Sequence, residues 1–291
     1  MADFSQWVAG ARPRTLPAAF APVAVGTGAA YTQGEANFGM ALLALVVAVS
    51  LQVGVNYAND YSDGVRGTDA TRVGPVRLVG QRLADPGTVK AAAFLSFGIA
   101  AVVGLALVAL ANAWLLLLVG AAAIVAAWRY TGGAHPYGYR GLGELAVFTF
   151  FGLVAVLGTQ WTQSQALSLA GFVGAVGVGA MACAILVANN LRDIPGDELV
   201  GKRTLAVTWG EDKTRRFYVV LMLGAFAIVP IAAFFYPWAL VTFLALPLAW
   251  FPIRTVRSGA LGGDLVPVLG GTGLAQLGYS VMLTAGLMLS V

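Results

Sequence analysis

Charged residues are scarce in this sequence, and cysteine is nearly absent. Only 10% of the 291 residues are charged and 59% are hydrophobic, against roughly 25% and 45–50% in an ordinary soluble domain. That balance excludes a soluble globular protein. The single cysteine, Cys183, excludes a disulfide within the chain and a metal cluster held by several cysteines.

Long apolar runs take the place of the missing charge. A helix needs about 20 apolar residues to cross a lipid bilayer, and such runs recur along the whole chain. Met40 to Leu51 and Trp114 to Trp128 do not alternate between apolar and polar residues, which argues against a transmembrane β-barrel. The sequence predicts one all-α membrane domain, residues 1–291, with helices around a central cavity. Nine transmembrane helices are expected, near 16–31, 39–58, 91–111, 113–128, 143–160, 168–190, 217–235, 238–253 and 265–290.

The basic residues fall on alternate connections between these spans. All 17 Lys and Arg residues precede the first span or lie between spans 2 and 3, 4 and 5, 6 and 7, or 8 and 9. Cytoplasmic loops of membrane proteins are enriched in Lys and Arg. The sequence therefore predicts an integral protein of the cytoplasmic membrane with its N-terminus inside and its C-terminus outside. This topology accounts for the net charge of +4, and no nucleic-acid partner is expected.

Asn and Asp residues cluster where the second span ends. Asn56, Asp60 and Asp63 occupy positions i, i+4 and i+7, which share one face if the span continues as a helix. Three oxygen ligands would then converge at the cytoplasmic end of that helix.

A second cluster follows the sixth span. Asn189, Asp193 and Asp197 fall at i, i+4 and i+8. Pro195 and Gly196 are residues at which the helix could end before it reaches Asp197. The two clusters lie four spans apart, and we expect them to face a common cavity.

Clustered carboxylates in a membrane protein need compensating charge, because an Asp at the centre of a spanning helix costs about 2.5–3.5 kcal/mol on insertion scales. Asn and Asp oxygens suit Mg²⁺, which completes its shell with water and phosphate. Arg77, Lys202 and Arg203 are placed to bind phosphate. The pattern predicts a site for Mg²⁺ and a diphosphate. Two alternatives stay open: interfacial charges paired with arginines, and the cation or proton pathway of a carrier.

These motifs resemble the UbiA superfamily of intramembrane aromatic prenyltransferases, and the resemblance covers nearly the whole chain. In the superfamily's first motif the third acidic position would fall on Gly64, so that either Asp63 or Asp69 replaces it. The segments that carry the resemblance are 12–17, 56–63, 67–69, 74–78, 130–133, 136–139, 141–144, 189–197 and 201–206.

Within the superfamily, the chain is most similar to the enzymes that prenylate a naphthoate. The resemblance implies Mg²⁺-dependent transfer of a polyprenyl group from polyprenyl diphosphate to 1,4-dihydroxy-2-naphthoate, with loss of diphosphate and CO₂, as a step of menaquinone biosynthesis. Asp69, Tyr139 or Glu144 would orient or deprotonate the acceptor. The alternatives are a prenyltransferase for another aromatic acceptor and a cation-coupled carrier.

The predicted topology can be tested with a reporter fused after Val291. The positive-inside rule applied to the basic loops places this end outside the cytoplasm. We expect an alkaline phosphatase fusion to be active and a green fluorescent protein fusion to be dark. The opposite pattern would mean that the number of membrane crossings is even.

Overall fold

The computed structural model describes residues 2–68 and 76–291, and within these ranges it is a bundle of helices without strands. Asp69, one of the candidate acids, lies outside the described residues. The α-helices are α1 (Phe4–Gly10), α2 (Pro17–Tyr31), α3 (Phe38–Arg66), α4 (Pro86–Leu110), α5 (Leu116–Arg129), α6 (Gly143–Val147), α7 (Ala155–Ser164), α8 (Leu169–Leu199), α9 (Leu205–Ala227), α10 (Val229–Ala233), α11 (Leu246–Arg257) and α12 (Val266–Leu289). A π-helix, Phe148–Val154, joins α6 to α7, and 3₁₀ helices span Pro13–Thr15, Tyr137–Arg140, Pro237–Ala245 and Gly262–Leu265.

Each of the nine expected spans coincides with a helical segment, but the described residues contain seven segments that are long and apolar enough to cross a membrane. The exceptions are α2 and α5, with 15 and 14 residues. At 1.5 Å per residue they are about 22 and 21 Å long, short of the roughly 30 Å hydrocarbon core. Pro17 is the first residue of α2, one position after the expected start. Proline is tolerated there because its missing N–H would have no partner within the helix. Seven of the nine expected spans are thus long enough to cross a membrane, and nine full crossings are not confirmed.

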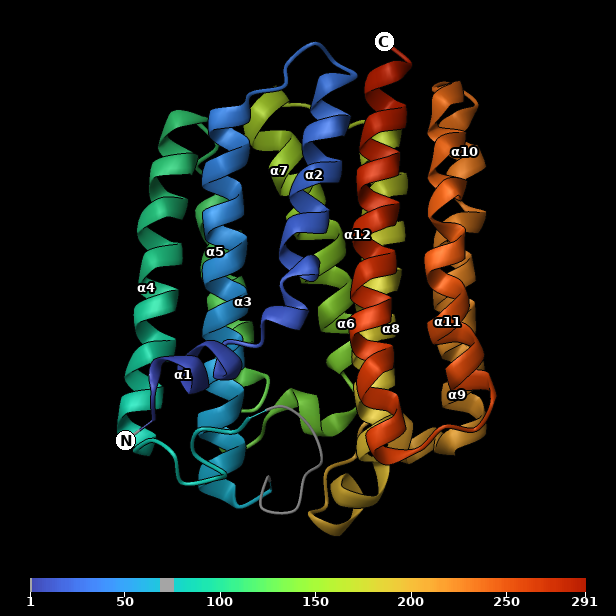
Figure 1. The fold of residues 1–291 in the computed structure, drawn as a ribbon. Coiled ribbons are helices and arrows are strands. Elements are labelled where there is room, and N and C mark those ends of the chain that lie inside the picture. The colour runs from blue at the N-terminus through green and yellow to red at the C-terminus, as the bar shows by residue number, and fades with distance from the viewer. Residues whose placement is uncertain (1, 69–75) are drawn as a thin grey trace.

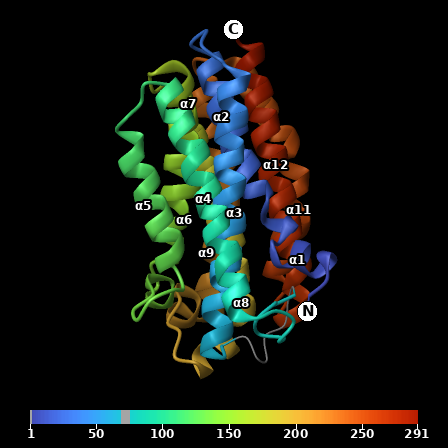
Figure 2. The same ribbon diagram turned by 90° about the vertical axis from the view of Figure 1, so that its left-hand side faces the viewer.

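The long helices run side by side along one axis, with the two ends of the chain at opposite ends of the bundle (Figures 1 and 2). The short helix α1 lies at the end where α3 and α8 finish (Figure 1). The segments that follow α5 and α8 lie at this same end. We call it the motif end, because α3 and α8 carry the two Asn and Asp clusters there.

The helices α3 and α8 continue beyond the ends predicted from the sequence. Asn37 caps α3 by accepting a hydrogen bond from the backbone N–H of Met40, and α3 ends at Gly67 in the left-handed conformation. Ser168 caps α8 in the same way, and α8 continues through Pro195 to Leu199. A proline removes one backbone hydrogen bond and need not end a helix that its neighbours hold in place. All six clustered residues therefore lie on helices.

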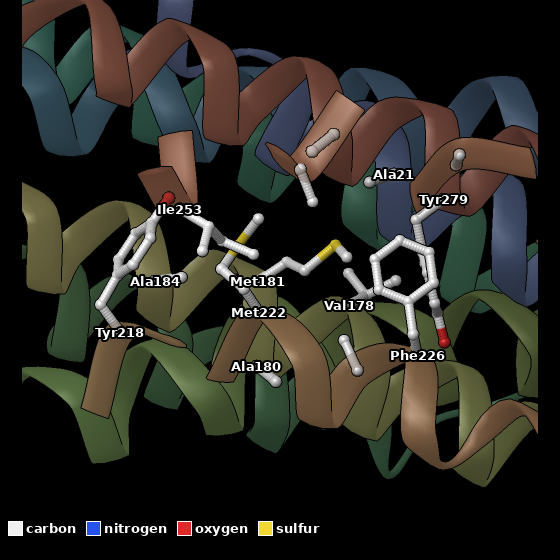
Figure 3. Close-up of a cluster of buried hydrophobic side chains, with 14 of the residues drawn as sticks. Ala21, Val178, Ala180, Met181, Ala184, Tyr218, Met222, Phe226, Ile253 and Tyr279 are labelled. Carbon is white, nitrogen blue, oxygen red and sulfur yellow. The ribbon is translucent and has the colours of Figure 1, made fainter. Parts of the chain in front are cut away.

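The largest apolar core surrounds α8 and packs it against α9 and α12, and residues of α11 join the same core. Figure 3 shows the side chains of Met181 and Met222 next to each other in this core. The rings of Phe226 and Tyr279 meet edge to face, with centroids 5.3 Å apart. Of the seven candidate spans, α8 is the most buried. It is the central helix on which the second cluster is fixed.

Candidate functional site

A cavity of about 1210 Å³ lies among α2, α3, α4, α5, the segment from α6 to α7, and α8. Its wall is apolar over most of its extent, with residues such as Leu51, Leu105, Leu117 and Phe150. Charged and amide side chains gather on the parts of the wall that belong to the motif end. The charged and amide residues of the wall are Arg12, Arg14, Gln52, Asn56, Asn59, Asp63, Arg77, Asn189, Asn190 and Lys202. Both sequence clusters thus contribute side chains to one cavity.

The amide of Asn56 is held in a defined orientation. Its Nδ2 donates hydrogen bonds to the carbonyl oxygen of Ala11 at 2.8 Å and to Oγ1 of Thr15 at 3.1 Å. The Thr15 hydroxyl donates its own hydrogen to the carbonyl oxygen of Arg12, so toward Asn56 it can only accept. Both amide hydrogens of Asn56 are therefore used, and Oδ1 is the atom available to a cation at the cavity wall.

Asp60 is bound to the backbone of a distant loop and does not line the cavity. Its Oδ2 accepts a hydrogen bond from the backbone N–H of Leu78 at 2.7 Å, and Oδ1 accepts one from Val79 at 3.1 Å. Asp60 and Leu78 are fully buried. The carboxylate fixes the segment after residue 75 against α3, and this segment includes the cavity residue Arg77.

Asp63 faces the cavity and is linked to the connection between α5 and α6. The hydroxyl of Tyr139 donates a hydrogen bond of 2.7 Å to Oδ1 of Asp63. Arg66 and Lys202 each lie 5.3 Å from the centroid of the Tyr139 ring, and Arg66 also donates to the carbonyl oxygens of Thr131 and Gly133. Burial and the negative charge of Asp63 raise the pKa of Tyr139 above its usual value. Tyr139 is therefore a neutral hydrogen-bond donor.

The second cluster is organised by Arg192. Its guanidinium donates two hydrogen bonds of 2.7 Å to the two carboxylate oxygens of Asp193 and one of 2.9 Å to Oδ1 of Asn189. Asn189 lines the cavity, whereas Asp193 does not.

The two predicted phosphate-binding residues after α8 differ in position. Nζ of Lys202 lies 3.3 Å from Oδ1 of Asp197, and Lys202 lines the cavity. Arg203 is exposed and lies outside the cavity wall; its backbone N–H donates to the carbonyl oxygen of Tyr139. Arg77 is buried and lines the cavity.

Glu144 is buried at the start of α6, and Oε1 accepts a hydrogen bond of 3.0 Å from Nδ2 of Asn190. Sequence spacing did not select Asn190 because it falls outside the i, i+4, i+8 series of the second cluster. Arg12 and Asn59 were missed as individual candidates as well, although both stand in segments that carry the family resemblance and both line the cavity.

The acidic residues of the described part of the chain do not converge on one point. No group of three or more His, Cys, Asp or Glu residues there could hold a metal ion by itself. The three cluster residues on the cavity wall are Asn56, Asp63 and Asn189. One carboxylate with amide oxygens is a donor set that fits Mg²⁺ when substrate phosphate completes the shell.

The sequence matches the family described as the UbiA prenyltransferase family over residues 19–261. It is 54% identical to the 1,4-dihydroxy-2-naphthoate octaprenyltransferase of Mycobacterium tuberculosis over 287 residues, 99% of this chain and 98% of that protein. It is 37% identical to the enzyme of the same name from Escherichia coli, with 98% of this chain and 95% of that protein covered.

Two solved structures share the fold. A digeranylgeranylglyceryl phosphate synthase superimposes with a TM-score of 0.64 at 14% identity, over 98% of both chains. A UbiA homolog from Archaeoglobus fulgidus, bound to DMAPP and Mg²⁺, has a TM-score of 0.60 at 12% identity, over 96% of this chain and 99% of that one.

The contacts of Asp60 and Asp63 predict different effects of removing each carboxylate. Asp60→Ala leaves two buried backbone N–H groups without acceptors, at about 1–3 kcal/mol each. We expect a clearly lower melting temperature in detergent for Asp60→Ala than for Asp63→Ala, and faster proteolysis of the segment after residue 75. Equal melting temperatures of the two variants would show that Asp60 does not hold that segment.

Proposed function

The chain belongs to the UbiA prenyltransferase family, and from this premise we propose that it transfers a polyprenyl group from polyprenyl diphosphate to 1,4-dihydroxy-2-naphthoate. The products are demethylmenaquinol, diphosphate and CO₂, which makes the reaction a step of menaquinone biosynthesis. Relatives that carry this activity in their names match along nearly their whole length. The resemblance found in the sequence motifs is confirmed at the level of the family.

The observation that carries the proposal is the division of one cavity into a polar end and an apolar remainder. Arg77 and Lys202 stand with Asp63 and amide side chains on the polar part of the wall, and aliphatic residues line the rest. A prenyl diphosphate has the same division, with a highly charged head on a hydrocarbon chain. Its head would bind Arg77 and Lys202 through charge-assisted hydrogen bonds.

The apolar part of the cavity is bounded on one side by α5. Residues of α5 from Leu116 to Ala127 line the cavity, yet α5 has no fully buried residue. A single short helix therefore separates the cavity from the outside of the bundle there. We propose that the polyprenyl chain reaches the lipid bilayer beside α5.

Mg²⁺ would be held at the polar end by Oδ1 of Asn56, by Asp63 and by Asn189, which all stand on the cavity wall. Asp193 and Asp197 follow on α8, paired with Arg192 and Lys202. Spacing places Asp60 in the predicted ligand set, but its carboxylate accepts hydrogen bonds from the backbone of Leu78 and Val79 and so holds that loop against α3. When bound, Mg²⁺ supplies positive charge that stabilises the diphosphate leaving group.

The reaction begins when the bond between C1 of the prenyl chain and its oxygen breaks, and both electrons go to the diphosphate. Arg77 and Lys202 stabilise the charge that develops there. The apolar wall keeps water from the allylic cation. The ring carbon that bears the carboxylate then donates an electron pair to C1, the bond to the carboxylate breaks, and CO₂ leaves as its electrons return to the ring. Tyr139 and Glu144 are the described candidates for orienting the acceptor.

The orientation in the membrane follows from charge. The basic loops lie at the motif end of the bundle, so we propose that this end faces the cytoplasm and that the protein resides in the cytoplasmic membrane. Both water-soluble groups, the diphosphate and the naphthoate, would enter from that side.

The sharpest test of the proposed function follows the carboxylate of the acceptor. Purified protein with 1,4-dihydroxy-2-naphthoate labelled in its carboxyl group should release labelled CO₂ only when a polyprenyl diphosphate is present. Attack by the ring provides the electron sink that the carbon–carboxylate bond needs. A prenylated product that keeps the label, or preferential prenylation of 4-hydroxybenzoate, would exclude this acceptor while leaving a prenyltransferase.

Chelation tests the metal. EDTA should abolish turnover, and added Mg²⁺ should restore it, because Asp63 is the one acidic member of the predicted ligand set on the described cavity wall. Asp63→Asn should need a higher Mg²⁺ concentration for half-maximal turnover, by about tenfold or more, since Mg²⁺ depends on carboxylate ligands. Turnover that is indifferent to EDTA would contradict the metal site.

A further inference from the structure

Glu144 and Asn190 form a buried pair between the start of α6 and the second cluster on α8. Nδ2 of Asn190 donates to Oε1 of Glu144 at 3.0 Å, and both residues are more than nine-tenths buried. Asn190 lines the cavity, whereas Glu144 stands outside its wall. Asn190 is therefore the member of the pair that a bound molecule can touch.

The pair fixes the orientation of the Asn190 amide. Nδ2 of Asn190 is the atom that faces Glu144, because it donates a hydrogen bond to Oε1 of that residue. Oδ1 of the same amide therefore points away from Glu144. No described residue donates a hydrogen bond to Oδ1. Asn190 thus offers a hydrogen-bond acceptor, and not a donor, to the contents of the cavity.

The neighbouring residues indicate what would use this acceptor. Asn189, next to Asn190, stands on the same cavity wall, and Lys202 stands there too. A diphosphate bound at that end carries acceptor oxygens only, so it has little use for another acceptor. The aromatic substrate carries hydroxyl groups, which are donors, and its ring has to lie close to the carbon that bears the diphosphate.

We propose that Oδ1 of Asn190 accepts a hydrogen bond from a ring hydroxyl of the aromatic acceptor, and that Glu144 is a positioning residue that acts through Asn190. This inference rests on the proposed function. A hydrogen bond from the hydroxyl to the amide oxygen raises electron density on the ring that attacks. It also selects hydroxylated acceptors, because a site built around a substrate hydroxyl rejects analogues that lack it.

The direct test combines variants of Asn190 with naphthoates that differ in their hydroxyl groups. Dissociation constants of 1,4-dihydroxy-2-naphthoate, 1-hydroxy-2-naphthoate, 4-hydroxy-2-naphthoate and 2-naphthoate are measured by competition for the wild type, Asn190→Ala and Asn190→Ser. In both variants we expect the dissociation constants of the dihydroxy compound and of one monohydroxy compound to rise by about tenfold. The dissociation constant of 2-naphthoate should not change. An equal loss for all four naphthoates, or no loss for any, overturns the proposal.

A second test exchanges the two side chains. Glu144→Gln allows the amide of residue 190 to rotate by half a turn, and Asn190→Asp places two carboxyl groups next to each other. Each variant should raise the KM for the naphthoate by about tenfold. The KM for polyprenyl diphosphate should stay within about twofold of the wild type. In the double variant, Gln at 144 can donate to Asp at 190 and restore an acceptor at the wall. We expect it to recover most of the loss. Failure of the double variant to recover removes Glu144 as a positioning residue.

Cys183→Ala is the matched control, because Sγ of Cys183 donates to the backbone oxygen of Glu144 without touching either amide or carboxylate. It should leave the KM for the naphthoate within about twofold of the wild type.

The activity of the wild type distinguishes failure of the proposed function from failure of this inference. If it prenylates no aromatic acceptor, the proposed function fails. If it prenylates 1,4-dihydroxy-2-naphthoate and Asn190→Ala binds that compound equally well, only this inference fails.

Discussion

Polar groups inside this bundle must find partners within it, because apolar helix faces and lipid supply no hydrogen bonds. The structure around the cavity follows from that requirement. Asp60 accepts hydrogen bonds from two backbone N–H groups. Asp193 accepts them from the guanidinium of Arg192, and Glu144 accepts one from the amide of Asn190. Each pairing also fixes a neighbouring element. The segment with Arg77 is held to α3 by Asp60, and the start of α6 is held to α8 by Glu144.

The same requirement gives different roles to residues that look equivalent from their spacing in the sequence. Asn56, Asp60 and Asp63 share one face of α3, yet their oxygens meet three different surroundings. Asn56 has its amide hydrogens tied to the N-terminal turn, Asp60 is enclosed by backbone, and Asp63 stands at the cavity opposite Tyr139. A motif in a membrane helix therefore combines residues that build the site with residues that face the substrate. Spacing alone cannot separate the two.

The helical membrane fold, the two clusters and their common cavity could be predicted from the sequence, because hydropathy and helical periodicity are local properties of the chain. The short helices α2 and α5 also lie close to the expected bounds 16–31 and 113–128, because their apolar runs are themselves short. The continuation of α8 through Pro195 could not be predicted. Neighbouring helices decide whether a proline ends a helix, and their positions are not written in the local sequence.

The hydrogen-bond partners of the site residues could not be predicted from the sequence, because each partner lies far from its site residue along the chain. Asp60 meets the backbone of residues 78 and 79, and Asn190 meets Glu144, 46 positions away. The second contact forms only when α8 is in place, and α8 is held there by the apolar core that it shares with α9 and α12. That core includes no residue of α5, which has no fully buried residue of its own. The fold therefore holds the charged groups on a tightly packed helix and leaves a thin wall beside the apolar part of the cavity. That arrangement suits a substrate whose head must be held firmly while its hydrocarbon chain extends into lipid.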